Sequence, residues 1–165
     1  MNKINTLADR EIDKEMLAFG LSPLHAYIRF MECLLHISYK IDIKRWYVAG
    51  KDNKEKVAER KKLIQSRFKA EMGLLIDMPK QSYGNTNDGN TARRFFKEAD
   101  KTSEITGINA ELIRRFHTIL VCIGSGFSIN IEAFDKYTSD TMKLYLSEYS
   151  WYYVPMTKFC FMERI

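Results

Sequence analysis

Apolar residues recur at helical spacing over most of this chain, and no other feature of the sequence constrains the fold as strongly. The first such segment follows Ser22-Pro23, which suits a helix cap followed by the first helical position, and extends to about Trp46. Intervals of three or four residues place side chains on one face of a helix. An amphipathic helix is therefore predicted here. Its apolar residues include Leu24, Ile28, Met31 and Leu35.

Four further helices are predicted from the same kind of signal. A basic helix runs from Lys54 to Met72 with a narrow apolar stripe, and Gly73 suits its end. Another helix begins near Ala92. The last two follow the cap residues Asn109 and Asn130, whose side-chain oxygens can accept hydrogen bonds from the first helical N–H groups.

One short apolar run, Leu74 to Met78, is the only candidate for an extended segment, and Pro79 closes it. The fold class is therefore predicted to be mostly α, with about five helices in one compact bundle. A length of 165 residues and a hydrophobic content of 45% favour one domain. We assign a polar lead-in to residues 1–20, the helical domain to residues 21–157 and a tail to residues 158–165.

Several classes of protein are disfavoured by what the sequence lacks. No run approaches the roughly 18 apolar residues of a membrane-spanning helix, so we expect a soluble intracellular protein with no membrane partner. The three cysteines, Cys33, Cys122 and Cys160, have neither CxxC spacing nor a histidine set beside them, so neither a disulfide framework nor a metal site is expected. There is also no Gly-rich phosphate loop, HExxH or GxSxG motif, and no catalytic residue is assigned.

The positive charge of the chain is concentrated in one stretch. The net charge is +5, from 26 Lys plus Arg and 21 Asp plus Glu. Between Lys40 and Lys80 there are 12 basic and 6 acidic residues, so the remainder is nearly neutral. A dense basic field releases counterions from a polyanion, whereas the alternative is an ordinary solvated helix face. On charge alone, Lys61, Lys62 and Arg67 are candidate DNA contacts.

The most unusual stretch is the Asn-rich joint from Ser82 to Thr91, which leads directly into Arg93 and Arg94. Asn, Asp and Gly tolerate positive φ, so such a loop can place free backbone N–H groups beside the two arginines. A helix N-terminus of this kind binds anions, and Asn90 would stand next to it. The alternative is a surface loop with an ordinary helix cap at Asp88 or Asn90.

The three histidines differ in their surroundings. His25 and Arg29 are four residues apart near the start of the first helix, so they share a face and together would grip a phosphate. The alternative is local, with His25 helping to cap the helix and Arg29 pairing with Glu32. His36 and His117 lie in apolar helical runs and are predicted to be core residues.

Four elements in a fixed order resemble one family. They are Leu24-His25-Ala26-Tyr27-Ile28-Arg29, the basic helix from Lys54 to Met72, Gly89-Asn90-Thr91-Ala92-Arg93-Arg94-Phe95-Phe96, and the aromatic tail Tyr149-Ser150-Trp151-Tyr152-Tyr153-Val154-Pro155. In this order they resemble Transib-type transposases and the related catalytic recombination-activating protein of V(D)J recombination. The resemblance covers about Leu17 to Thr157, and residues 158–165 diverge from it.

The resemblance implies a fold, a partner and a location. In that family a ribonuclease-H-like core carries three metal-binding acidic residues, and a large helical insertion separates the second from the third. This sequence resembles the insertion. The Mg²⁺ or Mn²⁺ and the structural Zn²⁺ of the parent family would therefore bind elsewhere, and no cofactor is expected in this chain. Arg93 and Arg94 would contact the DNA backbone, His25 and Arg29 would lie near the catalytic centre, and the location would be nuclear.

Three functions follow from these observations. The first is a transposase-derived DNA-binding fragment that lacks a complete DDE-type catalytic site and is inactive alone. The alternative is a domesticated protein-interaction module, in which Trp151, Tyr152 and Tyr153 form an exposed surface for a full-length relative or a second copy of the chain. The third and least favoured is a metal-dependent DNA nuclease or recombinase that uses its own Asp77 and Asp88.

Overall fold

The described part of the chain is built from helices. The computed structural model describes residues 22–80, 84–125 and 127–152, so the predicted lead-in 1–20, the tail 158–165, and Tyr153 and Pro155 of the aromatic tail lie outside it. The helices are α3 (Pro23–Lys40), α4 (Lys51–Arg67), α5 (Gly89–Lys97), α6 (Ala99–Thr106), α7 (Ala110–Gly124) and α8 (Ile131–Tyr149). A π-helical turn, η1 (Phe68–Met72), continues α4. The predicted mostly α fold is confirmed.

Four helices begin where a polar side chain caps the first turn. Ser22 accepts a hydrogen bond from the His25 N–H at the start of α3, and Asn130 accepts one from the Ala133 N–H at the start of α8. Asn109 and Asp88 do the same for α7 and α5. Each side chain satisfies a backbone donor that has no partner within the helix. The predicted starts at Ser22, Asn109 and Asn130 are therefore confirmed.

Two predicted helix boundaries are wrong. The first helix ends at Lys40 rather than near Trp46, because the chain turns through Lys44, whose φ of 45° is left-handed. The third predicted helix is two helices, α5 and α6, which separate at Glu98. The Thr102 hydroxyl donates to the Phe95 carbonyl at 2.7 Å, so a side chain occupies an acceptor in the last turn of α5. The count is therefore six helices in the described ranges, not five.

The candidate extended segment forms no strand within the described residues. Its end makes one isolated antiparallel bridge between Pro79 and Asn85. The Thr86 N–H donates to the Met78 carbonyl at 2.9 Å, and the Met78 N–H donates to the Thr86 hydroxyl at 3.1 Å. Asp77, with a φ of 50°, bends the run before it can continue as a strand.

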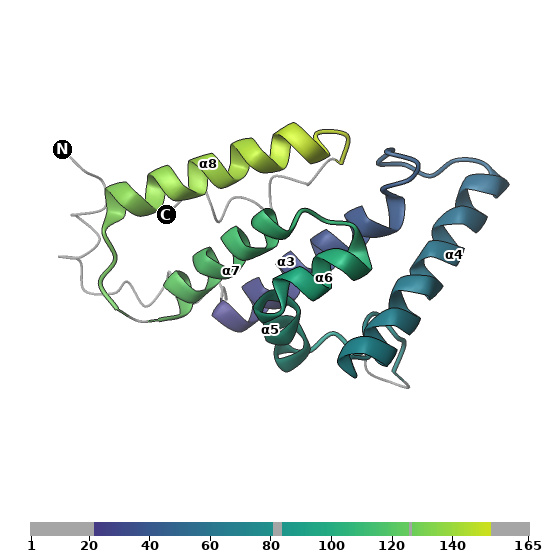
Figure 1. Cartoon of the computed structure of the whole chain (residues 1–165), viewed down its shortest axis with the longest axis horizontal. Helices are drawn as coiled ribbons and strands as arrows, with labels where there is room; N and C mark the ends of the chain where they lie inside the picture. The colour runs from purple at the N-terminus through teal and green to yellow at the C-terminus, as the bar shows by residue number, and fades with distance from the viewer. Residues whose placement is uncertain (1–21, 81–83, 126, 153–165) are drawn as a thin grey trace.

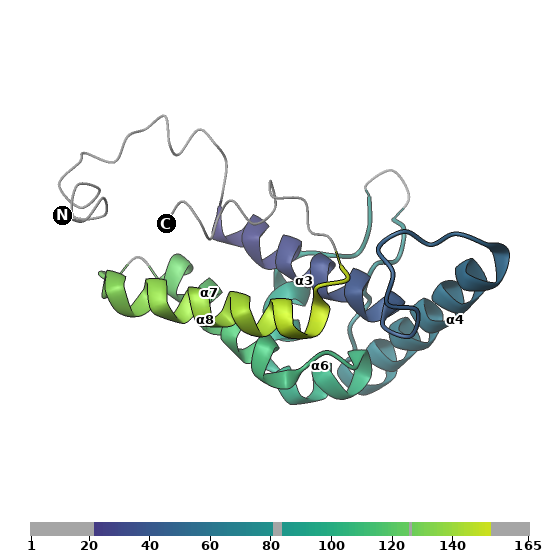
Figure 2. The same ribbon diagram turned by 90° about the horizontal axis from the view of Figure 1, so that it is seen from above.

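Helix α3 lies at the centre of the bundle. It packs against α4, α5 and α7, while α8 lies along α7 on one side and α4 forms the opposite edge (Figures 1 and 2). The core between them is rich in aromatic rings: Phe30 and Phe116 lie 5.0 Å apart between centroids, and Phe68 and Phe95 lie 5.7 Å apart. These buried rings pack α3 against α7 and η1 against α5, which are segments distant in the sequence.

Polar contacts contribute much of the attachment of the edge helix α4, and Arg60 makes the most extensive of them. Ile64 is the only buried residue of α4, so this helix contributes little to the core. Arg60 donates from Nε to the Ser38 carbonyl at 2.6 Å and from Nη2 to the Thr106 carbonyl at 3.1 Å. The Ser38 hydroxyl also donates to the Thr106 carbonyl, at 2.9 Å. This set of three residues, the Arg60 clamp, therefore joins α3, α4 and α6.

Arg60→Ala should lower the free energy of unfolding by about 1–3 kcal/mol, because charge-assisted hydrogen bonds to the carbonyls of two buried residues are lost. Lys62→Ala is the matched control, since Lys62 is exposed on the same helix, and it should change this free energy by less than about 0.5 kcal/mol. Urea unfolding followed by circular dichroism measures both. Equally small effects would show that Arg60 does not hold α4 on the bundle.

Candidate nucleic-acid interface

A carboxylate occupies the N-terminus of α5. The Asp88 side chain accepts a hydrogen bond from the Thr91 N–H at 2.8 Å, and this bond is the main cause that lowers the pKa of the Asp88 carboxyl. A phosphate at the same place would meet that negative charge instead of free N–H groups. The Asn-rich joint therefore ends in an ordinary helix cap at Asp88 and does not form an anion site at the N-terminus of α5.

The asparagines of the joint hold the loop in shape. Asn87 accepts from the Asp77 N–H at 2.8 Å and donates to Glu32 at 3.4 Å, so it links the loop to α3. Asn85 donates to the Asp77 carboxylate at 3.3 Å. These amide groups satisfy backbone and carboxylate partners within the protein. A ligand surface on α5 would therefore lie on the side of the helix rather than at its N-terminus.

The exposed side of α5 is almost entirely basic. Its buried residues Ala92, Phe95 and Phe96 face the core, and Glu98 at its end is the acidic residue beside the exposed face. That exposed face consists of Asn90, Arg93, Arg94 and Lys97. The structure thus places three of the predicted DNA contacts, Asn90, Arg93 and Arg94, on one face of α5. Lys97 lies on the same face.

Arg93 is the arginine of this face that is available to a ligand. Its guanidinium lies 5.8 Å from the centre of the Tyr27 ring, which steadies the side chain without neutralising its charge. Arg93 is exposed and forms no salt bridge with any residue of the described ranges. Its positive charge is therefore directed to solvent, as a contact to phosphate requires.

Arg94 is largely committed to the fold. Its Nη2 donates to the Met72 carbonyl at 2.7 Å and lies 3.7 Å from the Glu98 carboxylate. Met72 ends the π-helical turn η1, so Arg94 supplies a donor to a helix end that has no partner of its own. Within the predicted arginine pair, the structure therefore separates a structural residue from an exposed one.

Lys97 was missed by the sequence analysis although its spacing was visible. It stands four residues after Arg93, so the two side chains share a face of α5. It also lies close to α7: burial is the larger cause that lowers the pKa of His117, and the charge of Lys97 is the second. Arg93 and Lys97 therefore form a basic pair, the α5 pair, one helical turn apart.

His25 and Arg29 have the local partners that were considered for them. The His25 ring nitrogen Nδ1 lies 2.9 Å from the Ser22 hydroxyl, and Arg29 pairs with Glu32 at 3.0 Å. Both residues remain exposed on α3. His36 was predicted to be a core residue and is exposed, because the buried face of α3 passes on either side of it through Leu35 and Ile37.

The candidates on α4 do not form a site with α5. Lys61 lies 2.5 Å from Asp77, and Arg67 pairs with Glu71 at 2.7 Å and donates to the Glu104 carbonyl at 2.8 Å. The hydrogen bond to Glu71 is the main cause that raises the pKa of Arg67. Lys62 is exposed. Of the three, only Lys62 has a charge without an acidic partner among the described residues.

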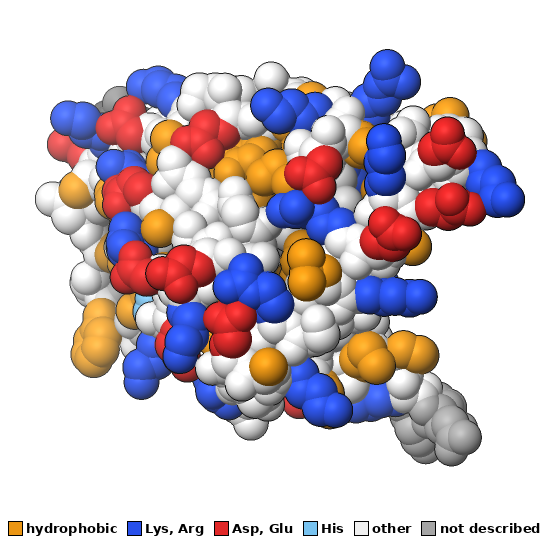
Figure 3. All heavy atoms as spheres, turned by 45° about the vertical axis from the view of Figure 1, so that its right-hand side comes forward, with side chains coloured by type: hydrophobic (Ala, Val, Ile, Leu, Met, Phe, Trp, Pro, Cys, Tyr) orange, Lys and Arg blue, Asp and Glu red, His pale blue; other side chains and the backbone are white. Residues whose placement is uncertain are grey.

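The local excess of basic residues is not one continuous basic face. Acidic residues Asp52, Glu55 and Glu59 alternate with lysines along the exposed part of α4. Figure 3, which brings the α4 side of the molecule forward, shows blue and red side chains interspersed on that face. Charges of both signs at this spacing largely cancel within one Debye length. The charge count alone therefore overstates the attraction of this helix for a polyanion.

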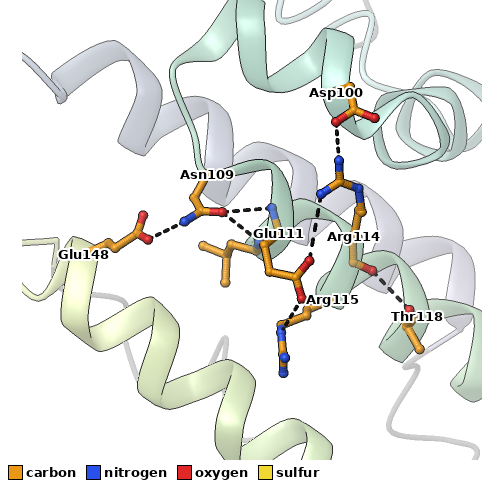
Figure 4. Close-up of polar contacts among 8 residues, drawn as sticks. Asp100, Asn109, Glu111, Arg114, Arg115, Thr118 and Glu148 are labelled. Carbon is orange, nitrogen blue, oxygen red and sulfur yellow. Dashed lines mark hydrogen bonds and ion pairs between the residues drawn. The ribbon is translucent and has the colours of Figure 1, made fainter.

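The arginines of α7 are paired with acids and contrast with Arg93. Arg114 pairs with Asp100 and Glu111, and Arg115 pairs with Glu111 at 2.8 Å (Figure 4). Each of these exposed ion pairs contributes little to stability, but it reduces the charge offered to a ligand. Arginine number on a helix is thus a poor guide to phosphate binding unless the partners are known.

The acidic residues of the nuclease hypothesis and the aromatic residues of the protein-interaction hypothesis also have partners within the protein. Asp77 holds Lys61 and Asp88 caps α5. Tyr149 and Tyr152 are buried and Trp151 is half-buried, so the part of the aromatic tail that is described packs onto the bundle rather than forming an exposed surface. Within the described ranges, no three His, Cys, Asp or Glu side chains come together as a set that could hold a metal ion.

Comparison with models of known protein families finds no match, and comparison with curated proteins finds none either. None of the helices in the described ranges is both long and apolar enough to span a membrane.

Arg94→Ala should lower the free energy of unfolding by about 1–2 kcal/mol, because the Met72 carbonyl loses a charged donor. Arg93→Ala, the neighbouring substitution, should change it by less than about 0.5 kcal/mol because Arg93 is exposed and its ring contact is weak. Thermal and urea unfolding of the two variants measures the difference. If Arg93→Ala were the more destabilising, the division of roles between these arginines would be refuted.

The stability contributed by Asp88 should depend on pH. Its folded-state pKa lies below the ordinary 3.8, so the contribution is complete above the unfolded pKa and is lost as the pH falls through the folded value. Near pH 7, Asp88→Ala should cost about 1 kcal/mol and Asp88→Asn much less, because Asn keeps an accepting oxygen. Urea unfolding from pH 7 down to about pH 2 should show the wild type and Asp88→Ala converging. A constant difference contradicts the assigned cap.

Proposed function

We propose that this chain is a transposase-derived DNA-binding fragment that holds the phosphate backbone of duplex DNA through the α5 pair and lacks a complete DDE-type catalytic site. The observation that carries the DNA contact is that Arg93 is exposed on a helix face lined by basic side chains and has no acidic partner among the described residues. The transposase origin and the nuclear location rest on the resemblance of the sequence elements described above.

The geometry favours backbone contacts over base readout. Arg93 and Lys97 are long side chains one turn apart on the surface of a short helix, so both can reach phosphates of one strand. The same helix is held from behind by Phe95 and Phe96, which are fully buried. Because the helix is already formed, its backbone adds little entropic cost to binding. Binding of this kind is sequence-independent and weakens with salt.

Asn90 completes the proposed contact, and the proposal leaves catalysis to other residues. Asn90 is exposed in the first turn of α5, one turn before Arg93, where its amide can donate to a phosphate oxygen. The metal ions of the parent family would be held by acidic residues outside this sequence. In the proposed function the chain therefore binds DNA and does not cleave it.

The double variant Arg93→Ala, Lys97→Ala should bind duplex DNA more weakly at every sequence. Loss of two phosphate contacts should reduce the slope of log affinity against log salt by about 1.8, since each contact contributes about 0.9. Fluorescence anisotropy with a labelled mixed-sequence duplex, titrated at several salt concentrations, measures affinity and slope together. Arg94 is left intact because its loss would also disturb the fold.

The matched control is Lys136→Ala, Lys143→Ala, which removes the same charge from exposed positions on α8. It should leave the slope unchanged to within about 0.5, because only direct phosphate contacts release counterions. If the control and the α5 double variant lose affinity equally, the effect is one of net charge and the assigned face is wrong. Reproducible nicking of supercoiled plasmid with Mg²⁺ that disappears on substitution of one acidic residue would contradict the proposed lack of catalysis.

A further inference from the structure

The loop between α3 and α4 presents cations and aromatic rings together. Lys44, Arg45, Trp46 and Tyr47 are exposed in succession, and we call this segment the basic–aromatic loop. Tyr47 is 76% exposed and Trp46 is 41% exposed. Neither Lys44 nor Arg45 forms a salt bridge with a residue of the described ranges. The loop therefore places exposed aromatic rings beside two cations that have no acidic partner in the described part of the chain.

The loop is held in place from beneath by α3. Lys40 donates from Nζ to the Trp46 carbonyl at 2.9 Å, and its ammonium lies 5.1 Å from the centre of the Trp46 ring. The Lys44 N–H donates to the Lys40 carbonyl at 2.9 Å, which closes the turn after α3. Burial lowers the pKa of Lys40, as expected for an ammonium covered by this loop.

Trp46 and Tyr47 have different roles in the loop. The Trp46 ring packs edge-on against the buried Tyr152 ring, with 4.9 Å between centroids, so it anchors the loop to the end of α8. Tyr47 is the next residue and remains open to solvent. The anchor holds the backbone of the loop, so ordering of the backbone adds little cost on binding.

We propose that the basic–aromatic loop binds single-stranded DNA, with an unpaired base stacked on Tyr47 and neighbouring phosphates on Lys44 and Arg45. Aromatic rings beside a positively charged track are what sequence-tolerant recognition of single strands requires, because every base has a face that can stack. In a duplex these faces are covered by neighbouring base pairs. Tyr47 therefore distinguishes single strands from duplexes, which the α5 pair does not.

Charge complementarity selects this occupant over a lipid surface or a protein. Asp42, the acidic residue nearest in sequence to the loop, already pairs with Arg60 at 3.0 Å, so Lys44 and Arg45 are left to attract a polyanion. The exposed ring of Tyr47 and the partly packed ring of Trp46 are too small an apolar area for stable insertion into a bilayer, which takes an amphipathic helix or a lipid chain. A protein partner would need a wider apolar surface around the ring.

The loop is separate from the α5 pair. It connects the end of α3 with the start of α4 at the edge of the bundle, whereas α5 lies below α3 and α7 in the view of Figure 1. The inference rests on the proposed function only in naming DNA as the polymer. The two surfaces can be tested independently because no residue is shared between them.

The test is fluorescence anisotropy with two probes, a labelled twelve-nucleotide oligo-dT strand and the mixed-sequence duplex. Tyr47→Ala should weaken binding of oligo-dT about tenfold, within the range of one lost base–aromatic stack, and should leave duplex binding within about twofold. Tyr47→Phe should stay within about twofold of wild type for both probes, since the ring that stacks is retained. Tyr47 is exposed, so these changes leave the fold intact, which circular dichroism checks.

Phe127→Ala is the matched control, because Phe127 is 82% exposed in the turn between α7 and α8 and no lysine or arginine lies beside it in the sequence. It should leave oligo-dT binding unchanged. Lys44→Ala with Arg45→Ala should reduce the salt slope for oligo-dT by about 1.4, at about 0.7 per contact to a single strand.

The outcomes separate the two hypotheses. If Tyr47→Ala leaves oligo-dT binding unchanged while Arg93→Ala, Lys97→Ala still weakens duplex binding, the loop inference is overturned and the proposed function stands. If the loop variants weaken oligo-dT binding and the α5 variant has no effect on the duplex, the proposed function is overturned and the loop inference stands. If Tyr47→Ala instead releases the protein from phosphatidylserine-containing vesicles and oligo-dT binding is unaffected, the loop faces a lipid surface and the inference is overturned.

Discussion

Two helix ends and an edge helix are held together by one guanidinium. Arg60 donates to the carbonyls of Ser38 and Thr106, which lie in the last turns of α3 and α6. Carbonyls at helix C-termini lack partners within the helix and carry the negative end of the helix dipole, so a cation is well suited to them. Helix α4 buries a single residue of its own. Gln65 and Arg67 add further hydrogen bonds from the same helix, to the carbonyls of Ile76, Asp77 and Glu104.

The same use of basic side chains recurs across the bundle. Arg94 satisfies the end of η1, Arg67 reaches the Glu104 carbonyl, and Lys40 supports the loop after α3. Several basic side chains of this bundle therefore satisfy backbone carbonyls, and those of Arg60, Arg67 and Arg94 lie at helix ends. These side chains are not available to a ligand in the same way as basic residues without such partners. This is why two compact surfaces, and not the whole basic stretch, carry the proposals.

The two surfaces differ in chemistry as well as in place. The α5 pair offers charge alone on a helix that buried phenylalanines support, which suits a regular phosphate backbone. The basic–aromatic loop adds an exposed ring, which suits a base outside a stack. A protein that engages both forms of DNA would be placed where a duplex opens.

Rules that act within four residues made much of the fold predictable: the caps at Ser22, Asn109 and Asn130 and the apolar face of each helix follow from neighbours in sequence. The break at Glu98, by contrast, depends on a side chain seven residues from the carbonyl it occupies. The availability of each arginine depends on still more distant partners, as with Arg94 and the Met72 carbonyl. The sequence by itself therefore determined the helical fold class and the starts of three helices, and it named most of the basic candidates. Only the tertiary structure decided which of them face solvent, because those hydrogen bonds join residues that no local pattern brings together.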